Sequence, residues 1–290
     1  MKWTYRAKPS SADTSRRRRR LPSAARMALR AGWWCILLCV SFWAGRQQTA
    51  AQNPDTAFAA LPACSSSEAL SGSSSSSPSA DSSPADPEPL AEGEVLSVPL
   101  LSQQQLGMPT GCELVSAGML LEYYGCDLTL YQWMDNCVEF STPWLQDGRM
   151  VNLSPWEAFI GSPWESSGYG CFAPVIRDAL ALALPDRQVE DLTGTSLEEL
   201  EREYLSRRIP VLVWVTICME ETSEGPSWLT PEGETFTRTN NEHCMVLVGS
   251  DSDNYIFNDP YQAGGQVSYP RQLAESRYEE MGRQAVAVTG

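Results

Sequence analysis

A long low-complexity segment limits where this chain can form a folded core. Residues 52–94 contain twelve Ser, eight Ala and six Pro among 43 positions, with seven acidic residues and no basic one. Such a composition cannot bury enough apolar surface to offset the entropy lost on ordering. We therefore predict that residues 52–94 are a disordered tether with an average reach of about 35–40 Å. The folded unit is expected at residues 95–290.

Charge is distributed unevenly on the two sides of this tether. Residues 1–51 carry eleven Lys and Arg against one acid, whereas the remaining 239 residues carry ten Arg, no Lys and 35 acids. The predicted domain has 28 acids and ten Arg, a net charge of −18. Phosphate backbones and anionic lipids would be repelled by it, which excludes nucleic acid as a partner. A cationic or neutral peptide is favoured as a substrate over an acidic one.

The basic leader, residues 1–51, contains a short apolar run at residues 31–44 (AGWWCILLCVSFWA). Its fourteen residues are fewer than the roughly twenty that cross a bilayer as a helix. Positive charge before a short apolar run is typical of a secretory signal. We expect a secreted protein, with an uncleaved anchor at residues 31–44 as the alternative. Either outcome is compatible with membrane or cell-wall attachment through the N-terminal segment.

The predicted domain combines helical and extended patterns. Apolar spacing and capping residues predict helices at 110–124, 129–138, 174–184 and 196–208. Strands are expected at 95–101, 211–217, 245–248 and 255–258. Helices early in the chain and antiparallel strands later are typical of the α+β class.

Cys112 is the first candidate for chemistry. Thr110 and Glu113 predict a capping box at a helix start, with Thr110 as the N-cap and Glu113 reaching back to it. Cys112 would then lie in the first turn, where free backbone N–H groups and the helix dipole favour an anion. A thiol there loses its proton more readily and becomes a nucleophile. The alternative is a small buried residue, which most free cysteines are.

His243 is the only histidine in the chain, which excludes metal sites built on several imidazoles. A single histidine is more often structural, but Asp259 favours a catalytic role. A hairpin centred on residue 251 would pair positions 243 and 259 directly, and one centred on 252 would make them diagonal neighbours. A half-residue shift of the hairpin centre would place Asp259 on the opposite face of the sheet from His243. Asn258 is then the alternative residue to orient the imidazole.

Three glutamines, Gln103, Gln104 and Gln105, lie seven to nine residues before Cys112. A side-chain amide at this position, together with the Cys112 backbone N–H, would provide two donors for a developing oxyanion. The alternative is that these glutamines are simply solvated in a loop.

Two segments resemble a known family. The stretches at 98–125 (VPLLSQQQLGMPTGCELVSAGMLLEYYG) and 243–260 (HCMVLVGSDSDNYIFNDP) resemble bacterial peptidase family thirty-nine-like domains, which are related to bacteriocin-leader-processing peptidases. The resemblance extends over most of residues 95–288. It implies a papain-like cysteine peptidase fold, with an N-terminal nucleophile helix packed on an antiparallel sheet.

The resemblance also assigns roles to four residues. It implies Cys112 as the nucleophile, His243 as the base and Asp259 as the residue that orients the imidazole. Gln103 becomes the oxyanion-hole glutamine, because VPLLSQ matches the family's usual Val-Pro-x-x-x-Gln opening. Such machinery requires neither a cofactor nor a metal.

The favoured hypothesis is an exported, monomeric cysteine peptidase that cleaves a peptide or protein substrate with a Cys-His-Asp triad. One alternative is a catalytically idle domain that binds peptides or cell-wall components. A second alternative is an amidase or thiol acyltransferase that acts on wall peptides.

Other residues support weaker expectations. Cys126 and Cys137 flank the second predicted helix and are a candidate disulfide pair. Three tryptophans in a stretch rich in Pro and Gly are hypothesised to line a substrate groove, with packing in the core as the plainer interpretation: Trp144, Trp156 and Trp164.

Overall fold

The computed structural model describes residues 88–262 and 265–290. The predicted leader and most of the predicted tether lie outside the described residues, as does the apolar run at 31–44. No helix in the described part of the chain is both long and apolar enough to cross a membrane.

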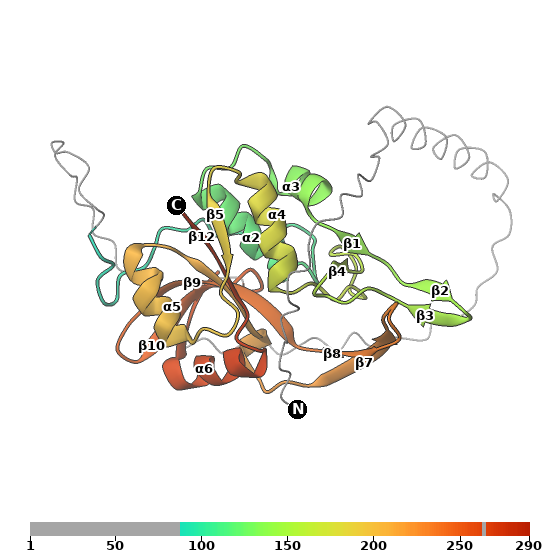
Figure 1. Cartoon of the computed structure of the whole chain (residues 1–290). Helices are drawn as coiled ribbons and strands as arrows, with labels where there is room; N and C mark the ends of the chain where they lie inside the picture. The colour runs from blue at the N-terminus through green and yellow to red at the C-terminus, as the bar shows by residue number, and fades with distance from the viewer. Residues whose placement is uncertain (1–87, 263–264) are drawn as a thin grey trace, which may run out of the picture. The chain divides into compact units, whose positions relative to one another are not determined.

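A six-stranded sheet forms the centre of the described domain (Figure 1). Its strand order is β11-β10-β9-β6-β12-β5, and every neighbouring pair is antiparallel. The strands are β5 (Gln188–Asp191), β6 (Val211–Thr216), β9 (Glu242–Ser250), β10 (Asn254–Asn258), β11 (Gln266–Pro270) and β12 (Ala285–Thr289). The adjacent strands β6 and β9 are buried along their whole length, as expected for runs of β-branched and apolar residues.

Helices cover both faces of this sheet. They are α2 (Cys112–Tyr123), α3 (Leu130–Cys137), α4 (Ala173–Ala183), α5 (Leu197–Glu203) and α6 (Arg271–Glu280), with short 3-10 turns η1 (Leu205–Arg207) and η2 (Ile217–Met219). Figure 1 shows α2, α3 and α4 on one side of the sheet and α6 on the other. Helix α2 packs on β9, where Ser116 Oγ donates a hydrogen bond to the Cys244 carbonyl at 3.0 Å. The predicted α+β class is confirmed.

A smaller set of strands lies beside the central sheet. A four-stranded sheet of order β2-β3-β7-β8 contains β2 (Trp144–Gln146), β3 (Arg149–Val151), β7 (Glu224–Leu229) and β8 (Thr235–Thr239). A parallel pair joins β1 (Phe140–Ser141) to β4 (Phe159–Ile160). Trp228 and Phe236 of the four-stranded sheet pack edge-on or tilted against Tyr169, with ring centroids about 6 Å apart. These aromatic contacts join the smaller sheet to the loop that precedes α4.

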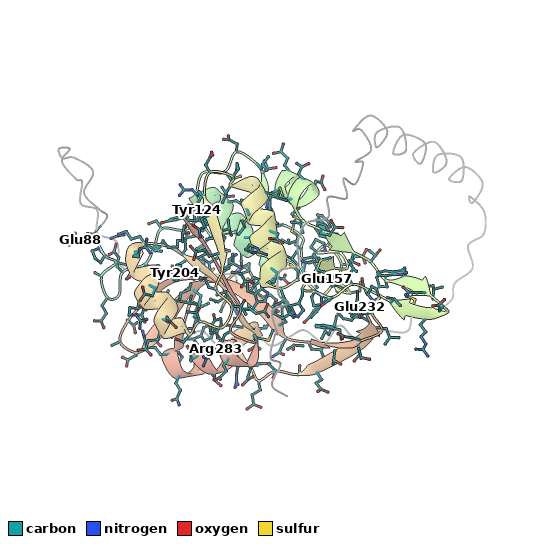
Figure 2. All side chains as sticks on the ribbon, viewed as in Figure 1. Glu88, Tyr124, Glu157, Tyr204, Glu232 and Arg283 are labelled. Atoms are coloured by element: carbon teal, nitrogen blue, oxygen red, sulfur yellow. The ribbon has the colours of Figure 1, made fainter. Side chains whose placement is uncertain are left out.

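Side chains fill the space between the helices and the central sheet (Figure 2). Trp133 and Trp214 are the largest fully buried side chains. Each indole N–H donates to a backbone carbonyl, Trp133 to Ala179 and Trp214 to Cys171, both at 2.9 Å. Buried indoles therefore carry no unsatisfied donor, as a stable core requires.

The helices expected from sequence are present, with differences at their ends. Helix α2 ends before Gly125, whose φ of +69° is the left-handed conformation expected of a residue that follows a helix. Ser196 accepts a hydrogen bond from the Glu199 N–H, as the cap pattern predicts. Helix α5 nevertheless ends at Glu203 instead of near Arg208, because the chain tightens into η1 and Arg208 adopts a φ of +63°.

The β9–β10 ladder contains a bulge that determines which residue faces His243. Near the turn, Tyr255 pairs with Ser250, a register that would place Asp259 on the wrong face of the sheet. A shift between Ile256 and Phe257 moves the pairing by one residue, so that Asn258 pairs with Val246. Beyond the bulge the ladder is therefore centred on residue 252, one of the two favourable registers considered from sequence.

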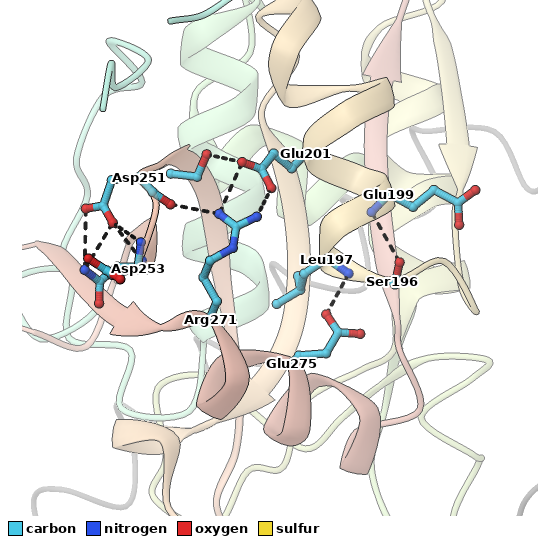
Figure 3. Close-up of polar contacts among 10 residues, drawn as sticks. Ser196, Leu197, Glu199, Glu201, Asp251, Asp253, Arg271 and Glu275 are labelled. Atoms are coloured by element: carbon cyan, nitrogen blue, oxygen red, sulfur yellow. Dashed lines mark hydrogen bonds and ion pairs between the residues drawn. The ribbon is translucent and has the colours of Figure 1, made fainter. Parts of the chain in front are cut away.

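Polar contacts fix the turn between these strands (Figure 3). Asp251 Oδ1 accepts from the backbone N–H groups of Asp253 and Asn254 at 2.8 and 2.7 Å. Arg271 Nη1 donates to the Asp251 carbonyl at 2.9 Å, and its guanidinium forms an ion pair with Glu201. The turn is thus fixed by Asp251 from within and by Arg271 of helix α6. These contacts limit changes in the pairing register between β9 and β10.

Candidate active site

Cys112 is the first residue of α2, but the cap differs from the predicted one. The N-cap is Gly111, and no side chain caps the helix. Thr110 Oγ1 instead donates to the carbonyls of Ser162 and Glu165, at 3.2 and 2.9 Å. The predicted capping box is therefore wrong, because a distant loop and not the helix takes up the Thr110 hydroxyl. Cys112 keeps its place in the first turn, where its backbone N–H has no acceptor within the helix.

His243 and Asp259 form a buried pair. Nε2 of His243 lies 2.7 Å from Oδ1 of Asp259, and the two side chains are 2% and 1% exposed. Asp259 Oδ1 also accepts from the Tyr261 backbone N–H at 2.8 Å, which fixes the carboxylate. Because Nε2 faces the carboxylate, Nδ1 is the ring nitrogen left for a reacting group.

Asn258, the fallback for the third role, points elsewhere. Its side-chain Nδ2 donates to the Val98 carbonyl at 3.0 Å, and its Oδ1 accepts from Gln266 at 3.4 Å. These contacts attach the opening segment of the domain to β10. Asp259 is the residue that contacts the imidazole.

Gln103 is buried close to both segments of the site. Its backbone N–H donates to the Pro260 carbonyl at 2.9 Å, one residue beyond Asp259. Its side-chain Nε2 donates to the Pro109 carbonyl at 3.0 Å, three residues before Cys112. One N–H of the amide is used in this contact, and the second remains available as a donor. Gln104 and Gln105, by contrast, are exposed.

Glu113 is a buried residue at the site whose role the sequence did not predict. The Cys112 thiol donates to its Oε2 at 3.3 Å, and its Oε1 accepts from the Cys171 backbone N–H at 2.8 Å. The His243 imidazole lies near enough to lower its pKa, although burial dominates and raises that pKa to about 7. The Glu113 carboxyl group thus contacts the Cys112 thiol directly and interacts electrostatically with His243. Within the described residues, the thiol's hydrogen-bond partner is Glu113 and not the imidazole.

Gly170 makes room for the Glu113 carboxyl group. A Cβ at Gly170 would overlap Glu113 Oε1, and the residue has a φ of +135°, which side chains rarely adopt. The loop before α4 therefore passes directly over the buried carboxyl group. This contact and the Thr110 hydrogen bonds attach that loop to the start of the nucleophile helix.

Glu242 brings a second buried carboxyl group to the site. It directly precedes His243 on β9, is 6% exposed, and its Oε1 has no hydrogen-bond partner among the described residues. Burial raises its pKa well above the ordinary value, and the neighbouring Glu113 adds to the shift. One ligand atom from each of Cys112, Glu113 and Glu242 lies within 4.8 Å of the other two.

This environment changes the state expected of the thiol. Burial raises the pKa of Cys112 well above its ordinary value, and Glu113 and Glu242 raise it further. The sequence predicted the opposite direction from the helix dipole. A helix start favours a thiolate only weakly compared with removal from water beside two acidic groups. We therefore expect the thiol to keep its proton in the absence of substrate.

The Cys112 side chain is buried and only 6% exposed. An open depression of about 360 Å³ lies on the four-stranded sheet, between Met150 and Trp228. A second, of about 290 Å³, lies between Glu122 and Leu130, where α2 ends and α3 begins. Both are lined by residues other than those of the site.

The three tryptophans hypothesised to line a groove are not part of either depression. Trp156 and Trp164 are 38% and 49% exposed, and Trp156 packs edge-on against Phe172 with centroids 4.7 Å apart. Their role in substrate binding stays a prediction.

The candidate disulfide between Cys126 and Cys137 is absent, since both are free thiols. Burial raises the pKa of the Cys137 thiol, and Cys126 adds to the shift. Cys218 is disulfide-bonded. Cys244 is fully buried and belongs to the core.

A cysteine at the first residue of a helix, packed on an antiparallel sheet that carries a buried His–Asp pair, defines a papain-like cysteine peptidase fold. The chain belongs to the peptidase C39-like family, because a model of that family matches residues 95–286.

Individual relatives agree with this membership. The uncharacterized protein YvpB of Bacillus subtilis (strain 168) is 28% identical over 201 residues, which are 68% of this chain and 77% of YvpB. The crystal structure of a candidate C39-like peptidase from Bacillus anthracis superposes with a TM-score of 0.59 at 29% identity. It covers 68% of this chain and 97% of that one.

A double-glycine-motif protease from an AMS/PCAT transporter, in complex with the leader peptide, is more distant. It has 17% identity and a TM-score of 0.36, over 69% of this chain and 95% of that one. A likeness this loose supports no conclusion about the substrate of the present chain.

Two residues of the site, Glu113 and Glu242, were not expected from sequence to lie beside the thiol. The available signal was adjacency: Glu113 follows Cys112, and Glu242 precedes His243 at the start of a buried strand. An acidic residue that opens a fully buried strand has to be accommodated by special contacts. That conflict could have identified Glu242 before the structure was known.

Proposed function

We propose that this protein is an exported cysteine peptidase that hydrolyses peptide bonds with Cys112, His243 and Asp259. The observation that carries the proposal is the buried 2.7 Å contact between His243 and Asp259, on a strand against which the helix that begins at Cys112 packs. Export is supported by the basic, then apolar, composition of residues 1–51.

The reaction begins when the thiol turns from Glu113 to the imidazole. The Cys112 proton passes to Nδ1 of His243, and the sulfur attacks the substrate carbonyl carbon. Asp259 holds the Nε2 side of the ring, which fixes the tautomer and stabilises the imidazolium. His243 then returns the proton to the leaving amine. Water, activated by the same imidazole, releases the acyl group from sulfur.

The developing oxyanion has two donors in reach of the nucleophile. One is the backbone N–H of Cys112, which has no intrahelical acceptor. The other is the second N–H of the Gln103 amide, whose first N–H is held by Pro109. The contact from Gln103 to Pro260 keeps this donor in register with Asp259.

In the resting enzyme, Cys112 is a protonated thiol. In this state the buried Cys112 thiol donates a hydrogen bond to Glu113. Because Cys112 is only 6% exposed, substrate entry requires neighbouring groups to move, among them the loop before α4 that contacts Glu113. A peptide that displaces this loop would also release the thiol from Glu113.

The function is tested with a peptide library and the full-length protein. Mass spectrometry of new termini should show cleavage by wild type and none by Cys112→Ala. Cleavage at side-chain amides or transfer of an acyl group to an added amine would instead assign an amidase or acyltransferase. Cleavage that persists in Cys112→Ala would overturn the proposed nucleophile.

A catalytically idle peptide-binding domain is the second candidate. The buried, protonated thiol favours it, because a binding domain does not need an ionised nucleophile. This candidate predicts that wild type and Cys112→Ala bind the same peptides with equal affinity and that neither cleaves them.

A further inference from the structure

The Cys112 thiol and the Glu113 and Glu242 carboxyl groups form a compact cluster of potential metal ligands. Their ligand atoms all lie within 4.8 Å of one another, and all three residues are buried. They come from two elements, the first turn of α2 and the first residue of β9, which pack directly on each other. The arrangement is therefore fixed by the main packing contact of the domain.

Glu242 provides an independent indication that the cluster binds a ligand. It is more than nine-tenths buried, and its Oε1 has no hydrogen-bond partner in the part of the chain that the structure describes. An oxygen of its carboxyl group is one of the three clustered ligand atoms. A buried polar atom without a partner destabilises the folded state, because it loses its hydrogen bonds to water and gains none in return. Within the described residues, neither Glu242 nor Glu113 forms an ion pair.

We propose that Cys112, Glu113 and Glu242 bind a thiophilic divalent cation of the Zn²⁺ class, which occupies the nucleophile and holds the enzyme inactive. Binding itself needs only these three side chains. Its inhibitory consequence rests on the proposed peptidase function, because a sulfur that donates its lone pair to a metal cannot attack a carbonyl.

The ligand chemistry selects the metal class. Zn²⁺ accepts thiolate together with carboxylate oxygen, whereas Ca²⁺ and Mg²⁺ require oxygen ligands and more of them. Three protein ligands leave the fourth tetrahedral position to water. With bonds of about 2.0–2.3 Å, two ligands on one Zn²⁺ lie about 3.6 Å apart. The cluster at 4.8 Å therefore has to contract by about 1 Å, which side-chain rotation can supply.

Charge is accounted for in the binding step. The thiol proton and any proton on the two carboxyl groups leave to solvent as the metal enters, and the sulfur and one oxygen from each carboxylate form the new bonds. The cation then offsets the repulsion between groups that otherwise raise one another's pKa. No oxidation or reduction is involved.

Cadmium provides a readout that does not depend on peptide cleavage. Full-length protein freed of metal with a chelator is titrated with CdCl₂, and thiolate-to-metal charge-transfer absorption is followed in the ultraviolet. Wild type should gain one equivalent of this absorption, and Zn²⁺ should displace it. Glu242→Gln should weaken binding at least tenfold, and Cys112→Ser should abolish the absorption.

Matched control variants distinguish metal binding at this site from metal binding by other acidic or thiol side chains of the protein. Glu232→Gln removes an exposed acid and should bind as wild type does. A Cys126→Ser, Cys137→Ser variant removes the neighbouring thiol pair and should also retain the signal. Circular dichroism of each variant establishes that it is folded. The proposal is overturned if Cys112→Ser keeps the absorption or if Glu242→Gln binds as tightly as wild type.

Inhibition is measured separately. Zn²⁺ should slow alkylation of Cys112 by iodoacetamide in wild type, as mapped by mass spectrometry, and should not do so in Glu242→Gln. This result is expected whether or not a peptide substrate has been found. If wild type cleaves peptides but binds neither Cd²⁺ nor Zn²⁺ at Cys112, the metal site is refuted and the peptidase function is not. If wild type binds the metal but cleaves no peptide, the proposed peptidase function is refuted and the metal site remains supported.

Discussion

Asp259 lies 2.7 Å from Nε2 of His243 because the β9–β10 ladder shifts by one residue before it reaches them. Without the bulge between Ile256 and Phe257, the carboxylate would emerge on the opposite face of the sheet. Bulges are known to re-aim side chains next to active sites. In this chain the bulge completes the His–Asp pair.

Asp259→Ala should therefore lower kcat by about 10³- to 10⁴-fold, because alanine neither orients the imidazole nor stabilises the imidazolium. The measurement is kcat on a peptide identified from the library. Asp253→Asn, an exposed change in the neighbouring turn, serves as the control and should leave kcat within a factor of two or so. Equal kcat values for the two variants would remove Asp259 from the mechanism.

Gln103→Ala should reduce kcat by about 10²-fold with little change in KM, since an oxyanion donor acts in the transition state and not on the bound substrate. Gln104→Ala is the matched control, because that side chain is exposed. Thermal unfolding of both variants distinguishes loss of the donor from loss of the Gln103 contact to Pro109. A rise in KM at constant kcat would indicate a binding role instead.

Gly170→Ala should destabilise the domain more than Gly194→Ala does. Both glycines have positive φ, but only a Cβ at Gly170 would overlap the Glu113 carboxyl group, whereas Gly194 faces open space. We expect a backbone cost of about 1 kcal/mol at Gly194 and an additional 2 kcal/mol or so at Gly170. Denaturant unfolding measures both. In a Glu113→Ala background the additional cost should disappear, and its persistence would exclude the carboxyl group as its cause.

Stability should fall as the pH rises from about 4.5 to 7. Burial raises the pKa of Glu113 from an ordinary value of 4.5 to about 7, so the folded protein holds a proton that the unfolded chain releases in this window. The free energy of unfolding should fall by about 3 kcal/mol across this window, and the fall should be complete above the folded-state pKa. Glu242, whose pKa is also raised, contributes with the same sign.

Glu113→Gln tests this pH dependence. The amide stays neutral, so the fall in unfolding free energy across the window should shrink by about 3 kcal/mol relative to wild type. Chemical denaturation at several pH values provides the measurement, with the exposed Glu232→Gln as the control. An unchanged slope would show that Glu113 does not carry the buried proton.

The sequence was informative where local patterns decide the structure. Helix α2, the buried strand β6 and the β9–β10 hairpin follow from apolar spacing and turn residues. The α+β class and the papain-like fold were predicted on that basis and on the family resemblance. Gln103, Cys112, His243 and Asp259 were named as the candidate site, and their catalytic roles remain proposals.

The remainder depended on tertiary contacts that no local pattern specifies. Thr110 looked like a helix cap, but its hydroxyl bonds to residues more than 50 positions away. The hairpin register could not be chosen because it depends on a one-residue bulge. The direction of the Cys112 pKa shift was predicted wrongly, because burial, Glu113 and Glu242 together outweigh the helix dipole. The short strands β2, β3, β7 and β8 have little apolar alternation and were not anticipated.

Covalent labelling with a pool of peptide vinyl sulfones tests most directly whether His243 activates Cys112. Tandem mass spectrometry follows the rate of adduct formation at Cys112 in wild type and His243→Ala, with Cys137 as an internal reference thiol. We predict that Cys112 is labelled at least about 10²-fold more slowly in His243→Ala while Cys137 is unaffected. Equal labelling of Cys112 in the two proteins would contradict the thiol–imidazole mechanism.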